Sequence, residues 1–351
     1  MIPDFETRLS AIDSFDGNLA FGAKVFHQET NRTGVGRPGE GGLVFEHSKI
    51  IQDTHNERYQ PIGNSWEPVD CCPACNDNDQ KPFLTRLGLT IQRCSNCGHR
   101  FQNPRITLER AIELYADDRT AAAIYSQPLQ LEIDSRKYRY GLQLLEWAGY
   151  TEKDGLLDFG CGVGLFLREA HSSGWTRCIG IDANQNYQRS YQGSHEIEFI
   201  NTNFESLDSE TLGSNFSAIA MWNVLEHIYE PFEVLSKLRK LLSDTGLLLI
   251  MVPNVESLAT RIIREKSATF NWKHISHFSA RSLRTLLERS GFIEIHLETV
   301  ISEIDNIKSY LSGEHPYHGH GDPENLFDFI TPRYIHQNFL GSRLLGVFRR
   351  A

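Results

Sequence analysis

The sequence lacks any long hydrophobic run. No apolar stretch approaches the roughly 20 residues that a transmembrane helix requires. The opening residues, MIPDFETRLS, also lack both the basic and the apolar part of a secretory signal peptide. We therefore expect a cytoplasmic protein that has no membrane partner.

Positive charge is also scarce. The chain has 35 Lys and Arg against 45 Asp and Glu, which gives a formal net charge of -10 at pH 7. Such a surface repels a phosphate backbone, whose neutralisation by Lys and Arg supplies much of the affinity of nucleic-acid-binding proteins. The charge balance therefore argues against a nucleic-acid partner.

No bias of composition marks the chain as disordered or fibrous. Hydrophobic residues make up 40% and charged residues 23% of the chain, as in ordinary soluble globular proteins. The length of 351 residues is about twice that of a typical domain of roughly 100–200 residues. We therefore expect two or three packed units.

The number of cysteines is odd, so they cannot all pair in a disulfide framework. There are seven, and most of them lie in CCPAC at 71–75 and CSNCG at 94–98. Each C-x2-C turn offers two thiolates, and two such turns complete a tetrahedral zinc shell that has no open position. The spacing therefore predicts a structural zinc site. Its expected ligands are Cys72, Cys75, Cys94 and Cys97, with Cys71 left over and His99 as an alternative ligand.

The chain divides into four segments. We interpret residues 1–70 as an N-terminal arm of short strands and loops, because the glycine-rich run NRTGVGRPGEGG is flanked by short apolar pieces. Residues 71–125 form the zinc-binding module, which ends in a predicted helix within TLERAIELYADD. Residues 126–300 form the main domain, and residues 301–351 form a lid or insertion followed by a last strand, SRLLGVF.

In the main domain, short apolar strands alternate with helical stretches. A helix predicted at 138–147 is followed by the strands GLLDF, CIGID, EFIN, FSAIAMW, GLLLIMV and FIEIHLE, with amphipathic segments such as PFEVLSKLRKLL and ARSLRTLLERSG between several of them. This alternation is typical of an α/β fold with a doubly wound, mostly parallel sheet and helices on both faces. The sequence therefore predicts a Rossmann-like main domain.

A glycine-rich turn follows the first of these strands. In LLDFGCGVGLFL, the strand contains Asp158 and then turns through Gly160, Gly162 and Gly164 into a helix. Glycines permit a tight turn and a close approach of the backbone to a ligand at the carboxyl edge of the sheet. The next strand ends in Asp182, where such folds place the acid that binds ribose hydroxyls. The pattern favours a nucleoside ligand.

The turn has the order GxGxG after an aspartate, whereas a dinucleotide fingerprint has GxGxxG. It resembles the first motif of the class I S-adenosylmethionine (SAM) dependent methyltransferases. The resemblance continues through IGIDAN, NTNFESL, AMWNVLEHI and LLLIMVPN, and it covers about residues 130–300. It implies a methyltransferase whose cofactor is SAM.

The resemblance also implies roles for individual residues. The glycine loop would surround the methionine moiety, Asp182 would hold the ribose, and Asn203 and Phe204 would lie beside the adenine. Trp222 and Asn223 would line the pocket floor near the sulfonium, although core packing is the alternative for Phe204 and Trp222. The implied cofactor-binding residues are Asp158, Gly160, Cys161, Gly162, Gly164, Asp182, Ala183, Asn203, Phe204, Trp222 and Asn223.

Methyl transfer to a hydroxyl or a carbon acid requires a base that takes a proton, and histidine suits that task. Glu226 and His227 follow the fourth strand, and similar zinc-containing sugar C-methyltransferases use an acid-histidine pair in this loop. His227 is therefore our first candidate for the base, with anchoring of the loop as the alternative. His274 and His277 precede a later helix and are further candidates.

The zinc module resembles the small N-terminal domain of bacterial methyltransferases that act on sugars and natural products. It implies a small-molecule acceptor, such as a sugar nucleotide or a natural-product intermediate, methylated on oxygen or carbon. Two alternatives remain open: an RNA-modifying enzyme whose zinc module binds nucleic acid, and a non-catalytic SAM-binding protein. The strand between the cysteine pairs, KPFLTRLGLTIQR, has few basic residues, which disfavours the first.

Two further segments match the family least. In GEHPYHGHGDPEN, the residues His315, His318 and His320 fit no firm metal-site spacing, and the glycine and proline content favours a lid over the acceptor. The N-terminal arm offers a surface for a homodimer.

Overall fold

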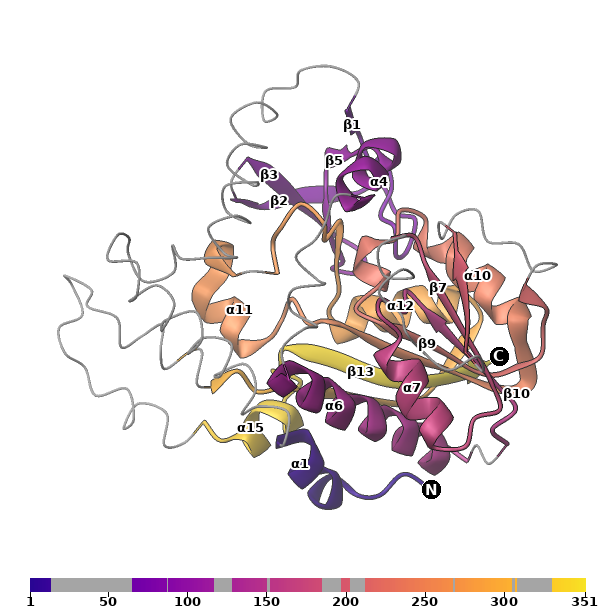
Figure 1. Ribbon diagram of the computed structural model, residues 1–351. Helices are drawn as coiled ribbons and strands as arrows, with labels where there is room; N and C mark the ends of the chain where they lie inside the picture. Colours follow the sequence, from indigo (N-terminus) through magenta and orange to yellow (C-terminus); the bar gives the residue numbers. More distant parts are fainter. Residues whose placement is uncertain are drawn as a thin grey trace, which may run out of the picture.

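The computed structural model describes residues 1–13, 65–86, 88–116, 128–149, 152–184, 197–202, 212–267, 269–304, 307 and 330–351. Within these ranges, no helix is both long enough and apolar enough to cross a bilayer. The described residues form a large α/β unit and a smaller unit of short strands, which lies above the large one in Figure 1.

The large unit is built on a seven-stranded sheet. Its strands are β6 (Gly155–Phe159), β7 (Arg177–Asp182), β8 (Ile197–Asn201), β9 (Phe216–Trp222), β10 (Leu242–Pro253), β12 (Phe292–Val300) and β13 (Arg343–Arg350). Their order across the sheet is β12-β13-β10-β9-β6-β7-β8. Strand β13 runs antiparallel to both of its neighbours, β10 and β12, and the other neighbouring strands in this sheet pair in parallel. The predicted fold class, an α/β doubly wound and mostly parallel sheet, is confirmed.

Helices cover both faces of this sheet, as Figure 1 shows. On one face, α6 (Pro128–Trp147) and α7 (Leu165–Ser172) pack their apolar side chains against alternate residues of β9 and β10, such as Ala218 and Leu249. On the other face, α10 (Pro231–Leu241) and α12 (Ala280–Arg289) pack against the intervening residues, such as Ile219 and Ile250. Strands that are buried on both faces explain the continuous apolar runs of the sequence.

The small unit consists of β1 (Trp66–Glu67), β2 (Gln80–Arg86), β3 (Leu89–Cys94), β4 (Arg100–Gln102), β5 (Arg105–Ile106) and α4 (Leu108–Ala116). Between the cysteine pairs, the chain forms the antiparallel hairpin of β2 and β3 rather than the single strand that we expected. A turn at Gly88, whose φ is 81°, reverses the chain there.

The small unit shares a sheet with the large one. Strand β11 (Ser276–His277) comes from the segment after β10, and it extends the small sheet to the order β11-β4-β3-β2. Ser276 pairs with Phe101 and His277 pairs with Arg100. The zinc module is therefore attached to the main domain by backbone pairing.

The N-terminus differs from our expectation of strands and loops. Residues Phe5–Asp13 form helix α1, which packs on the large unit through the fully buried side chain of Ile12. Arg8 Nε donates to Glu298 Oε2 over 3.0 Å, and both side chains are buried. The glycine-rich run that guided the expectation lies outside the described residues, and so do residues 308–329.

The remaining described elements connect these parts. They are the 3-10 helices η2 (Leu225–His227) and η3 (Arg264–Lys266), and the helices α11 (Leu258–Ile263) and α15 (Pro332–Gln337). Helix α15 lies near α1 in Figure 1, and Arg333 of α15 forms an ion pair with Glu6 of α1. Helices α4 and α6 confirm the two helices predicted at those places, although α6 is longer than expected.

Candidate functional site

The strand order of the large sheet reverses at β6. The chain passes from β6 to β7 and β8 on one side, and β9 then lies on the other side of β6. In open α/β sheets, ligands bind outside the carboxyl ends of the strands at such a reversal. Asp158, Asp182 and Trp222 lie at or near the carboxyl ends of β6, β7 and β9. The predicted cofactor residues therefore gather at one edge.

The loop between β6 and α7 turns on glycines with left-handed backbone angles. The φ angles are 80° at Gly160, 53° at Gly162 and 73° at Gly164, which directly precedes α7. A Cβ at Gly160 would lie 2.4 Å from Cγ2 of Val224, so no side chain fits there. A Cβ at Gly162 would meet no described atom within 4 Å. The backbone at Gly162 therefore faces open space, and a ligand can approach it closely.

Asp182 holds this loop. Its Oδ2 accepts a hydrogen bond from the backbone N–H of Gly162 over 2.9 Å, and its Oδ1 accepts one from Asn184 N–H over 2.8 Å. Burial raises the pKa of the Asp182 carboxyl, while these two hydrogen bonds oppose the rise. A carboxylate has about four lone-pair positions, so the same oxygens can also accept from hydroxyls. Ala183, which follows, is exposed at this edge.

Asp158 lies beneath the loop with 2% of its surface exposed. Its Oδ1 has no hydrogen-bond partner among the described residues. Burial, followed by the charge of Asp182, raises the pKa of Asp158 well above its usual value. Such an orphaned carboxyl oxygen fits a ligand that brings a hydrogen-bond donor or a cation. Cys161 beside it is a buried thiol whose pKa burial raises, which fits a space-filling role.

Trp222 and Asn223 follow at the end of β9. The indole of Trp222 packs edge-on against Tyr138 and Phe166, with ring centroids 5.0 Å and 5.3 Å away. Its Nε1 is buried without a hydrogen-bond partner among the described residues. Asn223 adopts a left-handed φ of 55°, and its Oδ1 is likewise buried and unpartnered there. Asn203 and Phe204, the predicted adenine contacts, lie outside the described residues.

Glu226, His227 and His274 come together beyond the end of β9. Nδ1–H of His227 donates to the carbonyl oxygen of Lys273 over 2.8 Å, and Nδ1–H of His274 donates to that of Thr269 over 2.9 Å. The rings of these histidines lie 5.0 Å apart. His227 Nε2 lies 3.9 Å from Glu226 Oε1. One carboxylate oxygen and one nitrogen from each ring lie within 4.8 Å of one another.

Burial changes the protonation of this group. It lowers the pKa of His227 to about 4 and that of His274 well below its usual value, and it raises the pKa of Glu226 to about 8. At neutral pH, both histidines are therefore uncharged and Glu226 is largely protonated. Because their Nδ1 atoms carry the protons, the Nε2 atoms present lone pairs that can accept a proton.

His277 lies apart from this group. Its side chain is 3% exposed within β11, and its ring contacts Phe270 at 5.0 Å. Burial and the neighbouring His99 lower the pKa of His277 to about 3. The ring centroid of His277 lies 6.5 Å from that of His274. His277 thus lies where the small sheet joins the main domain, in strand β11, which pairs with β4.

Arg343 and Glu303 lie at the same edge, and no sequence pattern predicted them there. Arg343 begins β13 opposite Pro253 and Val300, the last residues of β10 and β12. Burial raises the pKa of the carboxyls of Glu226 and Glu303, and the charge of Arg343 opposes the rise at each. Because β13 runs antiparallel, its first residue reaches the edge where the parallel strands end. The antiparallel direction is a signal that the sequence alone did not display.

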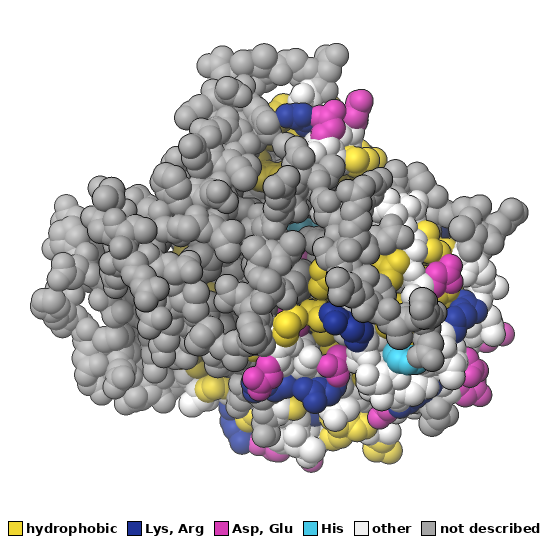
Figure 2. All heavy atoms as spheres, in the orientation of Figure 1, with side chains coloured by type: hydrophobic (Ala, Val, Ile, Leu, Met, Phe, Trp, Pro, Cys, Tyr) yellow, Lys and Arg dark blue, Asp and Glu magenta, His cyan; other side chains and the backbone are white. Residues whose placement is uncertain are grey.

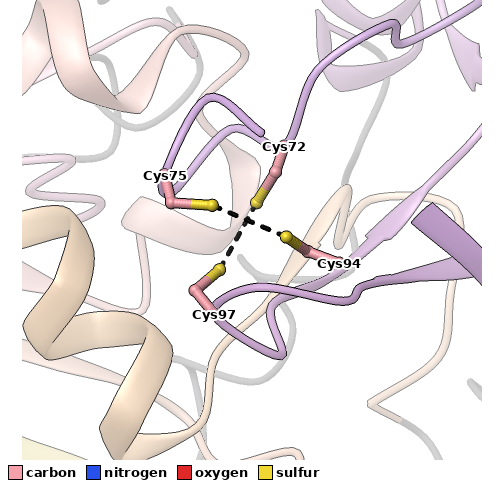
Figure 3. Close-up of side chains that lie close together, drawn as sticks. All are labelled: Cys72, Cys75, Cys94 and Cys97. Atoms are coloured by element: carbon pink, nitrogen blue, oxygen red, sulfur yellow. Dashed lines mark hydrogen bonds between the residues drawn. The ribbon is translucent and has the colours of Figure 1, made fainter. Parts of the chain in front are cut away.

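The four predicted zinc ligands converge, as Figure 3 shows. The Sγ atoms of Cys72 and Cys97 are 3.6 Å apart, and those of Cys75 and Cys94 are 3.5 Å apart. A tetrahedral zinc ion with Zn–S bonds of about 2.3 Å requires sulfur–sulfur distances of about 3.8 Å. Asn76 and Gly98 follow the two pairs with left-handed φ angles of 65° and 77°. The donor set and its spacing fit a zinc ion.

The face of the molecule in Figure 2 carries charges of both signs. Lys and Arg side chains of the described residues lie among Asp and Glu side chains on this face. Among the described residues, such side chains also form ion pairs, for example Arg139 with Glu169 and Lys153 with Glu146. The mixture gives this visible part no extended basic surface among the described residues.

The main domain is similar to known proteins. Residues 131–297 match the family model described as a methyltransferase domain. No curated protein matches the chain. Many solved structures resemble it, at low identity.

Three of these solved structures illustrate the likeness. The methyltransferase bound to the Trm112 activator of Haloferax volcanii has a TM-score of 0.46 and 16% identity, with 68% of this chain and 97% of that chain covered. The plantazolicin methyltransferase BpumL, solved with SAH, has a TM-score of 0.47 and 16% identity, with 68% and 93% covered. A SAM-dependent methyltransferase from Mesorhizobium loti has a TM-score of 0.41 and 18% identity, with 59% and 96% covered.

Proposed function

Because residues 131–297 match a methyltransferase domain, we propose that the protein transfers a methyl group from SAM to an oxygen or carbon atom of a small molecule. The observation that carries the proposal is the glycine loop held by Asp182 beside the open space at Gly162. A sugar nucleotide or a natural-product intermediate is the proposed class of acceptor.

The donor would bind along the edge formed by β6, β7 and β9. SAM supplies an electrophilic methyl group on a sulfonium. Asp182 would accept hydrogen bonds from the ribose hydroxyls while it keeps the loop in place, and the backbone at Gly162 would contact the methionine part. The orphaned Oδ1 of Asp158 would accept a hydrogen bond from the amino-acid end of the ligand. Trp222 and Asn223 support the floor of the pocket from the end of β9.

The acceptor would lie beyond β9, where Glu226 and His227 follow in η2. His227 is the proposed general base. The carbonyl of Lys273 fixes its tautomer, so Nε2 would take the proton of the acceptor atom as that atom bonds to the methyl carbon. The bond between the methyl carbon and sulfur breaks in the same step, and its electron pair stays on sulfur. Glu226, held protonated by burial, donates a hydrogen bond to an oxygen of the acceptor. In-line transfer otherwise requires positioning of the two reactants.

We also propose that Cys72, Cys75, Cys94 and Cys97 bind a structural zinc ion. Four thiolates leave no coordination position for an acceptor. The ion closes the two cysteine turns, and β4 then pairs with β11 of the main domain. The zinc module would thereby fix the segment that carries His274.

A substitution of the base tests this proposal. Purified protein is assayed for methyl transfer from SAM to a panel of sugar nucleotides and natural-product intermediates. The His227→Ala variant should lose roughly 10²-fold or more in kcat, as is usual for removal of a general base. Its affinity for SAM should be unchanged. His171→Ala is the control, because His171 lies in the last turn of α7, away from the carboxyl edge. Equal turnover of His227→Ala and wild type would remove His227 as the base.

A further inference from the structure

A carboxylate and two imidazoles meet at the acceptor side of the edge. Among the described residues, Glu226, His227 and His274 form a group of potential metal ligands separate from the four cysteines. His227 and Glu226 belong to η2, whereas His274 lies 47 residues later, just before β11. The fold therefore joins two segments that the sequence presents separately.

Both histidines are oriented in the way that metal-binding histidines usually are. Each donates its Nδ1–H to a backbone carbonyl, that of Lys273 for His227 and that of Thr269 for His274. A carbonyl oxygen only accepts hydrogen bonds, so these contacts fix the proton on Nδ1. A ligating histidine typically uses such a contact to fix its tautomer and its ring orientation. Nε2 is then the atom that can bind an ion.

The buried carboxyl group of Glu226 also points to a bound ion. Glu226 is 1% exposed, and neither of its carboxylate oxygens has a hydrogen-bond partner among the described residues. A buried carboxylate is costly unless it is paired, hydrogen-bonded or bound to a metal. An ion between Glu226 and the two rings would satisfy its oxygens.

The dimensions are close to those of a three-ligand site. The three donor atoms lie within 4.8 Å of one another. Zinc bonds to nitrogen and carboxylate oxygen of about 2.0–2.2 Å require ligand separations of about 3.4 Å in a tetrahedron. Small rotations of the side chains close the difference. The His227 side chain is 22% exposed, so an ion can enter from solvent and keep an open position.

We propose that Glu226, His227 and His274 form a second metal site, which binds a divalent transition-metal ion such as Zn²⁺ in the acceptor-free enzyme and thereby blocks the base. Imidazole and carboxylate ligands suit such ions. The inhibition rests on the proposed function, because the Nε2 lone pair of His227 cannot bind the ion and accept a proton at the same time.

The charges that surround the site are mixed. Arg343 and Lys273 are the cations that act on its members, and Glu303 is a second carboxylate within reach of Arg343. Binding of the ion would displace the proton that burial keeps on Glu226, and the resulting carboxylate together with Glu303 would balance the two cations. An ion with two positive charges therefore meets no net repulsion from these neighbours.

Zinc stoichiometry tests the site directly. Full-length protein that retains its four-cysteine ion is dialysed against increasing free Zn²⁺, and bound zinc per chain is measured by mass spectrometry. Wild type should bind one zinc ion per chain more than either His274→Gln or His227→Gln. His277→Gln is the matched control, because His277 is a neighbouring buried histidine outside the group, and it should bind as many ions as wild type.

Equal zinc content in wild type and both ligand variants would overturn the site. Calorimetric binding of SAM by each variant verifies that it is folded, and Zn²⁺ should leave the affinity for SAM unchanged. If neither wild type nor any variant binds SAM, the proposed function is refuted. The number of zinc ions bound per chain would still test the second metal site. In an assay with an acceptor that the enzyme methylates, added Zn²⁺ should raise the KM for the acceptor and leave kcat unchanged. Faster turnover with Zn²⁺ would contradict the blocking of the base.

Discussion

At the scale of single residues, burial decides the chemistry of the acceptor side. Desolvation favours the uncharged form of an ionisable group, so it lowers the pKa of histidines and raises that of carboxylic acids. His227 and Glu226 show both effects next to each other. A neutral histidine beside a neutral carboxylic acid provides a proton acceptor and a hydrogen-bond donor at the same pH.

The depressed pKa of His227 predicts the pH dependence of the reaction. The base works only when Nε2 is unprotonated, and the pKa of His227 is lowered to about 4 by burial. The acidic limb of the kcat/KM profile for wild type should therefore fall near pH 4, rather than near the usual histidine pKa of about 6.5. A pH profile of the folded enzyme measures this, and a limb near pH 6.5 would contradict the buried, neutral base.

The raised pKa of Glu226 predicts that the stability of the fold depends on pH. Its pKa is about 8 in the folded protein against 4.5 ordinarily, so the folded state holds more protons than the unfolded state between these values. The free energy of unfolding should therefore decrease as the pH rises from 4.5 towards 8. Glu226→Gln should remove this part of the decrease.

Urea unfolding at pH 7 and pH 8 measures this difference. Unfolded histidines are largely neutral there, and so are the folded His227, His274 and His277, so these three contribute little to the slope. Wild type should lose more stability than Glu226→Gln between the two pH values. Parallel losses in the two proteins would show that the carboxyl of Glu226 is ionised when folded.

At the scale of elements, the loop between β6 and α7 depends on two glycines for different reasons. Gly160 lacks space because Val224 lies against it, whereas Gly162 has space but a left-handed φ. Gly160→Ala should therefore lower the free energy of unfolding by ~2–5 kcal/mol, from strain and overpacking together. Gly162→Ala should lower it by ~1–2 kcal/mol, from strain alone.

Urea unfolding measures the loss of stability in Gly160→Ala and in Gly162→Ala. Titration with SAM then measures the effect of each substitution on binding. Because Gly162 faces the open space, Gly162→Ala should weaken SAM binding more than it weakens the fold. Equal stability of Gly160→Ala and wild type would contradict the close contact with Val224.

Local patterns predicted most elements, and long-range contacts explain what they missed. The apolar runs around Leu157 and Ile250 and the C-x2-C turns carry their own signal over a few residues. The pairing of His277 with Arg100 and the approach of His274 to His227 join segments far apart in the chain. No spacing in the sequence encodes those contacts, so the three-residue group was not predicted.

At the scale of the whole molecule, the zinc module and the main domain are joined by a shared sheet. Strand β11 belongs to the main domain by sequence and to the small sheet by hydrogen bonding. Arg281 of α12 also donates to the carbonyl of Asn96, between the second pair of cysteines. Loss of the metal should therefore affect more than the module itself.

Removal of zinc by a strong chelator tests this coupling. Metal release leaves four clustered thiols without the ion that holds the two turns, so the Tm should fall by several degrees. Hydrogen exchange should rise at Ser276 and His277 as well as at the cysteine turns. Faster exchange confined to residues 66–106 would contradict a mechanical link between the two units.

SAM is proposed to bind at the loop that Asp182 holds in place. Calorimetric titration with SAM, performed on the zinc-replete wild type and on Asp182→Ala, tests it most directly. We expect wild type to bind SAM and the variant to lose this binding, because Asp182 fixes the loop at Gly162 and is proposed to accept hydrogen bonds from the ribose hydroxyls. Absence of binding by wild type, or equal binding by Asp182→Ala, would contradict the claim.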